Sequence, residues 1–253
     1  MMKYTAREMM AIRAGRFIKN GDILFAGTGV SMLAATVAKK IHAPKSVVFF
    51  ETGGIDPSLD ELPLAVADPR VMSGTSMNSG LIEAFSIVGH RKLHTIAFLG
   101  AAQIDRFGNL NSTCIGDYRR PKIRFSGSGG ACDAASLASG VIIFMQHDRR
   151  KFVKGVDYLT SPGWLEGRAS RKKAGLTRGG PIAVVTNLGI MKFHERTKEM
   201  YLAEYYPGIT IDHIAEHTGF EMDISKAVES EPPTEEELRI LREEVDPQRL
   251  ILG

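Results

Sequence analysis

Short apolar runs alternate with segments of helical periodicity along the first half of the chain. Residues 23–26, 46–50 and 95–100 are largely apolar runs of strand length, and each is followed by glycine or another small residue within a few positions. Within residues 31–41, apolar side chains recur at helical spacing. The order of strand 23–26, helix 31–41 and strand 46–50 predicts a parallel pair of strands joined by a right-handed crossover.

Capping signals and further apolar runs extend this pattern to the C-terminus. Thr5 with Glu8 forms a capping box that opens a helix to about residue 19, and Thr234 with Glu237 opens a charged helix to about residue 245. Further strands are expected at residues 122–125, 141–145, 156–160, 182–186, 189–193 and 201–206, and further helices near residue 131 and over 210–217. Residues 56–79 are expected to form a long loop beside the site.

These elements predict the α/β class. We expect an open, mostly parallel sheet flanked by helices, with an antiparallel addition near the C-terminus where residues 201–206 return along the preceding strand. The sequence shows no internal repeat, low-complexity tract or clear linker. A single domain over residues 1–253 is therefore the simplest interpretation.

Composition and charge narrow the classes of partner. Of the 253 residues, 43% are apolar and 24% are charged, as in an ordinary globular protein. The longest apolar runs, such as 141–145, are too short to cross a bilayer, and residues 1–5 lack the apolar core of a signal peptide. Cys114 and Cys132 lack metal spacing and indicate a reducing cytoplasm. The net charge of +3 is too small to indicate nucleic-acid binding. We expect a cytoplasmic protein that binds neither nucleic acid nor membrane.

Glu51 is the candidate catalytic residue. It directly follows the apolar run 47–50, and Gly53 and Gly54 come next. In an open α/β sheet, ligands bind just beyond the carboxyl ends of the strands. A carboxylate placed there is a candidate general base or covalent nucleophile, and the two glycines would let a substrate approach the backbone closely. The alternative is a strand-end glutamate that only reaches solvent.

Two glycine turns lie between a predicted strand and a predicted helix. The candidate binding residues are Gly27, Thr28 and Gly29 in the first turn, and Gly127, Gly129, Gly130 and Ala131 in the second. Such turns present free backbone N–H groups at a helix N-terminus, where anions or a developing oxyanion are favoured. The alternative is that these glycines only make tight turns. Gln103, after strand 95–100, is a further candidate because its amide could donate to a substrate carbonyl at the same crevice.

Several common motifs are missing or incomplete. The third glycine of a dinucleotide-binding motif would fall at Met32 or Cys132, and no Walker A lysine–serine pair occurs. Ser128 is preceded two positions earlier by Ser126, so the nucleophile elbow of serine hydrolases is not formed. Residues 213–217 spell H-x-x-E-H, but no further acidic ligand stands out on a following helix. We therefore expect no metal site.

Together these segments resemble a known family over nearly the whole chain. The matching segments are Gly27–Gly29, Glu51–Gly53, Gly100–Asp105, Gly108–Thr113, Ile115–Tyr118, Phe125–Ala131, Thr160–Trp164 and Thr218–Phe220. The chain resembles the B subunits of the glutaconate CoA-transferases, which are family I CoA-transferases. Ala101 and Thr52 are mild departures, where the glutaconate enzymes have glycine and serine.

The resemblance implies ping-pong transfer of coenzyme A between an acyl-CoA and a carboxylic acid. Glu51 matches the family's glutamate, which forms an acyl-glutamyl anhydride and then a glutamyl-CoA thioester. The residues around Gly129, Gly130 and Ala131 are similar to the family's glycine loop. Coenzyme A is then a substrate, and no metal or redox cofactor is needed. Because the family active site lies between two homologous subunits, an A subunit is the expected partner, in a heteromer.

Two other functions stay open at this point. The same scaffold could hydrolyse CoA thioesters if water captured the acyl-glutamyl intermediate. The chain could also be a non-catalytic binding or regulatory module, which would not need a nucleophile at Glu51. The acyl groups are not identified by the sequence, and a dicarboxylate such as glutaconate is the expectation by resemblance.

Overall fold

A computed structural model describes residues 4–59 and 61–253. The expectation that no signal peptide is present therefore rests partly on residues 1–3, which lie outside the described residues. The chain divides into two compact units. Unit 1 comprises Met1–Phe98 with Pro232–Gly253, and unit 2 comprises Leu99–Glu231. No helix in the described part of the chain is long and apolar enough to cross a membrane.

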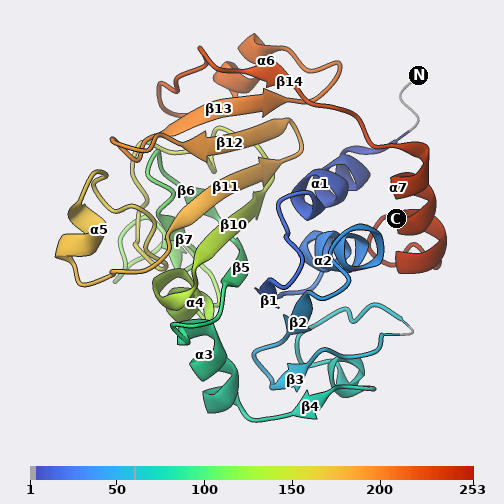
Figure 1. The fold of residues 1–253 in the computed structure, drawn as a ribbon. Helices are drawn as coiled ribbons and strands as arrows, with labels where there is room; N and C mark the ends of the chain where they lie inside the picture. The colour runs from blue at the N-terminus through green and yellow to red at the C-terminus, as the bar shows by residue number, and fades with distance from the viewer. Residues whose placement is uncertain (1–3, 60) are drawn as a thin grey trace. The chain divides into compact units, whose positions relative to one another are not determined.

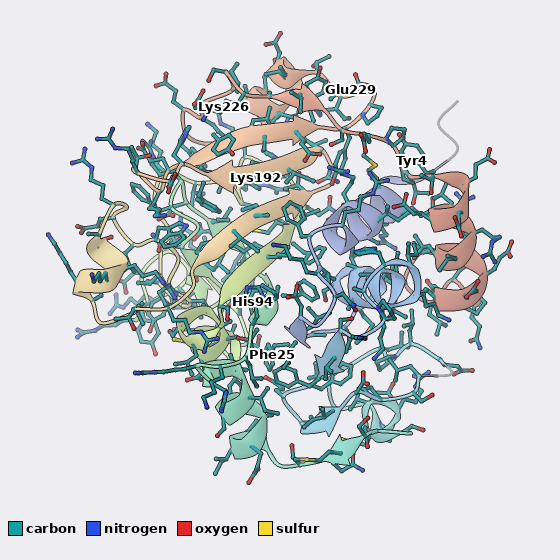
Figure 2. The ribbon with its side chains drawn as sticks, in the orientation of Figure 1. Tyr4, Phe25, His94, Lys192, Lys226 and Glu229 are labelled. Atoms are coloured by element: carbon teal, nitrogen blue, oxygen red, sulfur yellow. The ribbon has the colours of Figure 1, made fainter. Side chains whose placement is uncertain are left out.

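Unit 1 is built on the predicted strand–helix–strand crossover (Figure 1). Its strands are β1 (Ile23–Phe25), β2 (Val47–Phe49), β3 (Gly54–Ile55), β4 (Met77–Asn78) and β5 (Thr95–Gly100), of which β5 extends two residues into unit 2. β1 pairs in parallel with both β2 and β5, while β3 and β4 add antiparallel strands beyond β2. The Phe25 ring, labelled in Figure 2, meets Phe49 and Phe85 at centroid distances of 5.5 and 5.6 Å.

Helices α1 (Ala6–Gly15) and α2 (Val30–Ile41) pack against each other in unit 1, and the C-terminal segment returns to them. That segment is α7 (Glu235–Arg239) followed by a π-helical turn, η2 (Ile240–Val245). Arg242 donates two hydrogen bonds to Glu8, at 2.6 and 3.0 Å, although Glu8 is only 1% exposed. Burial alone would raise the pKa of Glu8, but the bonds from Arg242 and Thr5 outweigh it and hold that pKa below its ordinary value. This pair fixes the C-terminal segment to the first helix.

The remaining elements of unit 1 are η1 (Pro69–Met72) and α3 (Leu81–Gly89). η1 and β4 lie within the predicted loop 56–79, whereas α3 follows it and was not predicted. Only Ala84 and Val88 of α3 are buried.

Unit 2 contains the C-terminal strands. These are β10 (Gly140–Met145), β11 (Pro181–Thr186), β12 (Gly189–Phe193), β13 (Met200–Tyr205) and β14 (Val228–Glu229), side by side in this order (Figure 1). β10 and β11 are parallel, while β12 is antiparallel to both β11 and β13. The helices of unit 2 are α4 (Ala131–Leu137), α5 (Ser170–Lys173) and α6 (Ile211–Glu216). Two small antiparallel hairpins are also present. One pairs β6 (Gln103–Ile104) with β7 (Leu110–Asn111), and the other pairs β8 (Cys114–Ile115) with β9 (Ile123–Arg124).

The predicted α/β class is confirmed, with its parallel strands and its antiparallel addition near the C-terminus. Both capping boxes are also confirmed, since the Thr5 and Thr234 hydroxyls accept from the backbone N–H groups of Glu8 and Glu237. The strand predicted at residues 156–160 is wrong, because that segment is a bent loop without ladder pairing. The first helix ends at Gly15, four residues earlier than predicted.

Candidate active site

The Glu51 turn is the tip of the hairpin that joins β2 to β3. Gly53 N–H donates to Phe50 O at 2.9 Å, so Glu51 and Thr52 occupy the two central positions of a β-turn. Phe50 N–H in turn donates to Gly54 O at 3.0 Å. The buried Phe49 and Phe50 anchor the turn, while the side chain of Glu51 is only half-buried. Glu51 thus lies two residues beyond the carboxyl end of β2.

Gly53 and Gly54 make room for the protein's own backbone. Gly53 has a φ of +103°, and a Cβ there would lie 2.0 Å from the carbonyl oxygen of Ser79. A Cβ on Gly54 would lie 2.1 Å from Val71 O. Ser79 N–H and Oγ both donate to Gly53 O, at 2.9 and 3.1 Å. The geometry therefore gives these glycines a role in fixing the Glu51 turn, rather than the expected role of admitting a substrate.

The first glycine turn lies beside the Glu51 turn in unit 1. Because β1 and β2 are parallel neighbours, residues 27–29 after β1 and Glu51 after β2 lie at the same edge of the sheet. Gly27, Thr28 and Gly29 are half-buried, and Gly29 is the N-cap of α2 with a φ of +84°. No atom lies within 4 Å of where a Gly29 Cβ would point, so this glycine, unlike Gly53, borders open space. The N-terminal N–H groups of α2 favour an anion at this place.

The second glycine turn is fixed within unit 2. Gly127 N–H donates to Ser112 O at 3.0 Å, and Ser112 Oγ donates to Gly127 O at 2.9 Å. Gly127 and Gly129 have φ values of +93° and +48°, and neither would bring a Cβ within 4 Å of another atom. Gly130 is the N-cap of α4 and Ala131 its first residue. The N–H groups of Ala131 and Cys132 donate to Ser128 O and Ser128 Oγ, both at 3.0 Å, so they are not the free donors that the sequence predicted here.

Gln103 is engaged inside unit 2. It is 5% exposed, and its Nε2 donates to Asp157 Oδ2 at 3.3 Å. Its Oε1 accepts from Asn111 Nδ2 at 2.7 Å and from Asp157 N–H at 3.0 Å. The geometry therefore favours a positioning role for this amide over the predicted donation to a substrate carbonyl.

Arg171 is a residue that sequence reasoning missed. It lies on α5 and is 2% exposed, and its guanidinium donates to the backbone carbonyls of Ala135 at 2.7 Å, Gly163 at 2.9 Å and Arg178 at 2.9 Å. Burial lowers its pKa to about 10, so it remains a cation at neutral pH. Ala135 belongs to α4, so Arg171 holds the helix that follows the second glycine turn. Its neighbours Lys172 and Lys173 are exposed, so this basic run contains one buried cation beside two that face solvent.

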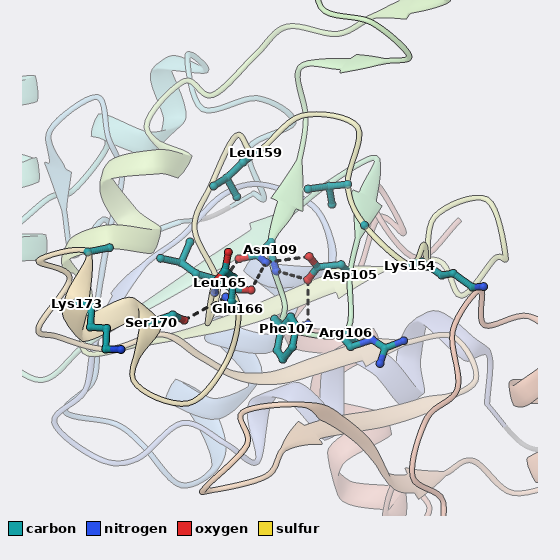
Figure 3. Close-up of a pocket in the computed structure, with 13 residues that line it drawn as sticks. Asp105, Arg106, Phe107, Asn109, Lys154, Leu159, Leu165, Glu166, Ser170 and Lys173 are labelled. Atoms are coloured by element: carbon teal, nitrogen blue, oxygen red, sulfur yellow. Dashed lines mark hydrogen bonds between the residues drawn. The ribbon is translucent and has the colours of Figure 1, made fainter.

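Unit 2 also contains a cavity of about 930 Å³ (Figure 3). Its wall is held by Asn109, which donates to Asp105 Oδ2 and to Leu165 O, both at 2.8 Å, and accepts from Gly163 N–H at 2.9 Å. Burial raises the pKa of Asp105 despite its hydrogen bonds from Asn109 and Phe107. None of the predicted site residues lines this cavity.

Two comparisons decide the family. The sequence profile of the family described as Coenzyme A transferase matches residues 7–217. The chain is 46% identical over 249 residues to the B subunit of glutaconate CoA-transferase from Acidaminococcus fermentans, with 96% of this chain and 93% of that protein covered. The chain belongs to the coenzyme A transferase family. The predicted resemblance to the B subunits of the glutaconate CoA-transferases is confirmed.

Further comparisons support this assignment. The CoA-transferase chain is 38% identical over 245 residues to the B subunit of 3-oxoadipate CoA-transferase from Pseudomonas knackmussii, covering 96% of this chain and 94% of that one. The crystal structure of glutaconate CoA-transferase from Acidaminococcus fermentans matches with a TM-score of 0.95 at 43% identity, covering 99% of this chain and 98% of that chain. The fold assignment therefore extends over nearly the whole chain.

Proposed function

We propose that this chain is the catalytic subunit of a heteromeric enzyme that transfers coenzyme A to a carboxylic acid through Glu51. The observation that carries the proposal is the position of Glu51 at the tip of the β2–β3 turn, beside the open Gly27–Gly29 turn. A carboxylate there can attack a thioester carbonyl while helix N–H groups face the developing oxyanion.

The proposed reaction proceeds by four displacements. Glu51 attacks the acyl carbonyl of the donor acyl-CoA, the C–S bond breaks, and CoA thiolate leaves an acyl-glutamyl anhydride. The thiolate then attacks the Glu51 carbonyl, which releases the donor as a free carboxylate and leaves a glutamyl-CoA thioester. The acceptor carboxylate attacks that thioester, which expels CoA thiolate and forms a second anhydride. The thiolate then attacks the acceptor's acyl carbonyl in this anhydride and forms the product acyl-CoA, with the Glu51 carboxylate as leaving group. Glu51 is restored as a carboxylate, and the energy of the thioester is retained throughout.

The partner and the acid are also proposals. Both relatives named above are B subunits, which supports pairing of this chain with a homologous A subunit. Glutaconate and 3-oxoadipate, in the names of these relatives, are both dicarboxylates, so we propose a dicarboxylic acid as one of the two acids. The expectation that residues 1–253 act as a single functional domain belongs to the same proposal.

The covalent intermediate provides the test. The chain, co-purified with its A subunit, is incubated with acyl-CoA without an acceptor and treated with borohydride, which reduces a glutamyl thioester to a primary alcohol. Peptide mapping should place the reduced residue at Glu51. Glu51→Gln should lose transfer by about three orders of magnitude or more, whereas Glu61→Gln, in the loop that follows the hairpin, should retain it.

Three outcomes would contradict the proposal. Reduction at a residue other than Glu51 would exclude it as the acyl acceptor. Loss of thioester at the transfer rate without any acceptor carboxylate would instead identify a hydrolase. Full turnover by Glu51→Gln would favour a non-catalytic role for this chain.

A further inference from the structure

We propose that helix α6 carries a surface site for a divalent transition-metal ion such as Zn²⁺, formed by His213, Glu216 and His217. The proposal concerns unit 2 and is independent of the transfer reaction. The sequence suggested no metal site here because no ligand stood out on a following helix. The structure shows that one helical turn supplies three donor groups by itself.

The three side chains converge on one point. Residues at i, i+3 and i+4 share a helix face, and one ligand atom of each residue lies within 4.8 Å of the other two. The His213 and His217 ring centroids are 4.3 Å apart. A tetrahedral zinc ion with bonds of about 2.0–2.2 Å needs its ligands somewhat closer together. Because His213 and Glu216 are exposed and His217 is half-buried, small side-chain rotations can close this difference.

A hydrogen bond prepares His217 as a ligand. Its Nδ1 lies 2.8 Å from the carbonyl oxygen of His213, and a carbonyl oxygen can only accept. The proton of the neutral ring must therefore be on Nδ1, which leaves the Nε2 lone pair free for a metal. Metal-bound histidines typically donate their other ring N–H to a backbone carbonyl or a carboxylate in the same manner.

The position in the helix also favours a cation. His217 is the C-cap of α6, and its N–H donates within the last turn to His213 O and Ile214 O. Helix C-termini carry partial negative charge, which attracts cations. Two imidazoles and one carboxylate suit zinc, nickel or copper better than Mg²⁺ or Ca²⁺, which prefer oxygen ligands. Three protein ligands leave one tetrahedral position for water.

A bound ion would cross-link the three side chains of the last turn of α6 and so stabilise that turn. The chain after this turn is already attached to the rest of unit 2, since Gly219 N–H donates to Phe152 O at 2.7 Å. Thr218 Oγ1 donates to Ile214 O at 2.8 Å on the buried side of the same turn. The ion would therefore hold the exposed side of a turn whose buried side is already fixed.

Calorimetric titration tests the site. The full-length protein is freed of metal with a chelator, desalted and titrated with ZnCl₂. We expect saturable binding that His213→Gln and His217→Gln each weaken by about tenfold or more, with a smaller loss in Glu216→Gln. His90→Gln removes a histidine of unit 1 that lies outside this cluster and should leave this binding unchanged. Excess Mg²⁺ should not compete.

Cobalt gives a second readout that does not depend on heats. Co²⁺ bound at a site with nitrogen ligands should show visible absorption that Zn²⁺ abolishes and that the two histidine variants lack, while their circular dichroism spectra match the unsubstituted protein. The proposal is overturned if the unsubstituted protein does not bind Zn²⁺, or if folded His213→Gln and His217→Gln bind it with unchanged affinity. Because neither readout uses turnover, failure here leaves the role of Glu51 untouched.

Discussion

Replacing Gly53 with alanine tests how the Glu51 turn is held. The new Cβ would lie 2.0 Å from Ser79 O, and contacts of this kind essentially never fall below 3.0 Å, so the Ser79 carbonyl must retreat by about 1 Å. The positive φ of +103° adds strain of about 1–2 kcal/mol for any residue with a Cβ. Weakening of the Ser79–Gly53 backbone hydrogen bond adds about 0.5–1.5 kcal/mol. Gly53→Ala should therefore lower the free energy of unfolding by about 2–4 kcal/mol.

Gly21→Ala is the matched control. Gly21 also lies in unit 1 with a similar φ of +91°, but no atom lies within 4 Å of where its Cβ would point. Gly21→Ala should then lower the free energy of unfolding only by the conformational strain of about 1–2 kcal/mol. Urea unfolding of both variants measures the difference between their free energies of unfolding. The dependence of this free energy on urea concentration should be the same in both variants, which shows that the same transition is compared. Equal destabilisation of the two would refute the argument that Ser79 limits the space at Gly53.

The same pair of variants links the turn to activity. A displacement of about 1 Å near a reacting group can reduce turnover about 100-fold. We expect a loss of this order in Gly53→Ala, measured as CoA transfer by the complex with its A subunit, and unchanged transfer in Gly21→Ala. Full activity in a destabilised Gly53→Ala would show that the turn tolerates the shift.

Three further substitutions test the buried polar groups. His147 is stacked on Phe152, and burial together with the neighbouring His217 and His213 lowers the pKa of His147 to about 3. The unfolded state therefore binds a proton first, and the unfolding free energy should fall as pH drops from about 6.5 towards 4. The pH dependence of the unfolding free energy should be weaker in His147→Gln, and an equal pH dependence in the two proteins would contradict this argument. Arg242→Met removes the charged hydrogen-bond donor of the buried Glu8 and should cost about 1.5–3 kcal/mol in urea unfolding, because Arg242 is partly exposed and Thr5 N–H still donates to Glu8. Loss of a fully exposed ion pair should cost under about 1 kcal/mol. Arg171→Met leaves several buried carbonyls without a donor and should cost about 2–4 kcal/mol; if denaturation midpoints are unchanged, the buried guanidinium does not hold α4.

Local signals in the sequence predicted much of the fold. The buried strands 23–26, 95–100 and 141–145 and the caps at Thr5 and Thr234 are encoded by residues close together in the chain, and the structure agrees with them. The prediction of a strand at 156–160 was wrong because these residues form a loop. In that loop Leu159 is 48% exposed, and the Thr160 hydroxyl accepts from Ser112 N–H. Apolar composition alone does not distinguish a strand from such a loop.

The candidate site divides in the same way. The sequence by itself determined that a carboxylate follows a buried strand, that glycines follow it, and which family the order of motifs resembles, because these depend on residue type and spacing. Only the tertiary structure decided that the backbone of Ser79 and Val71 packs closely against Gly53 and Gly54, while Gly29, Gly127 and Gly129 border open space. It also decided that one arginine in a basic run is buried, since burial depends on which distant segments pack against a residue.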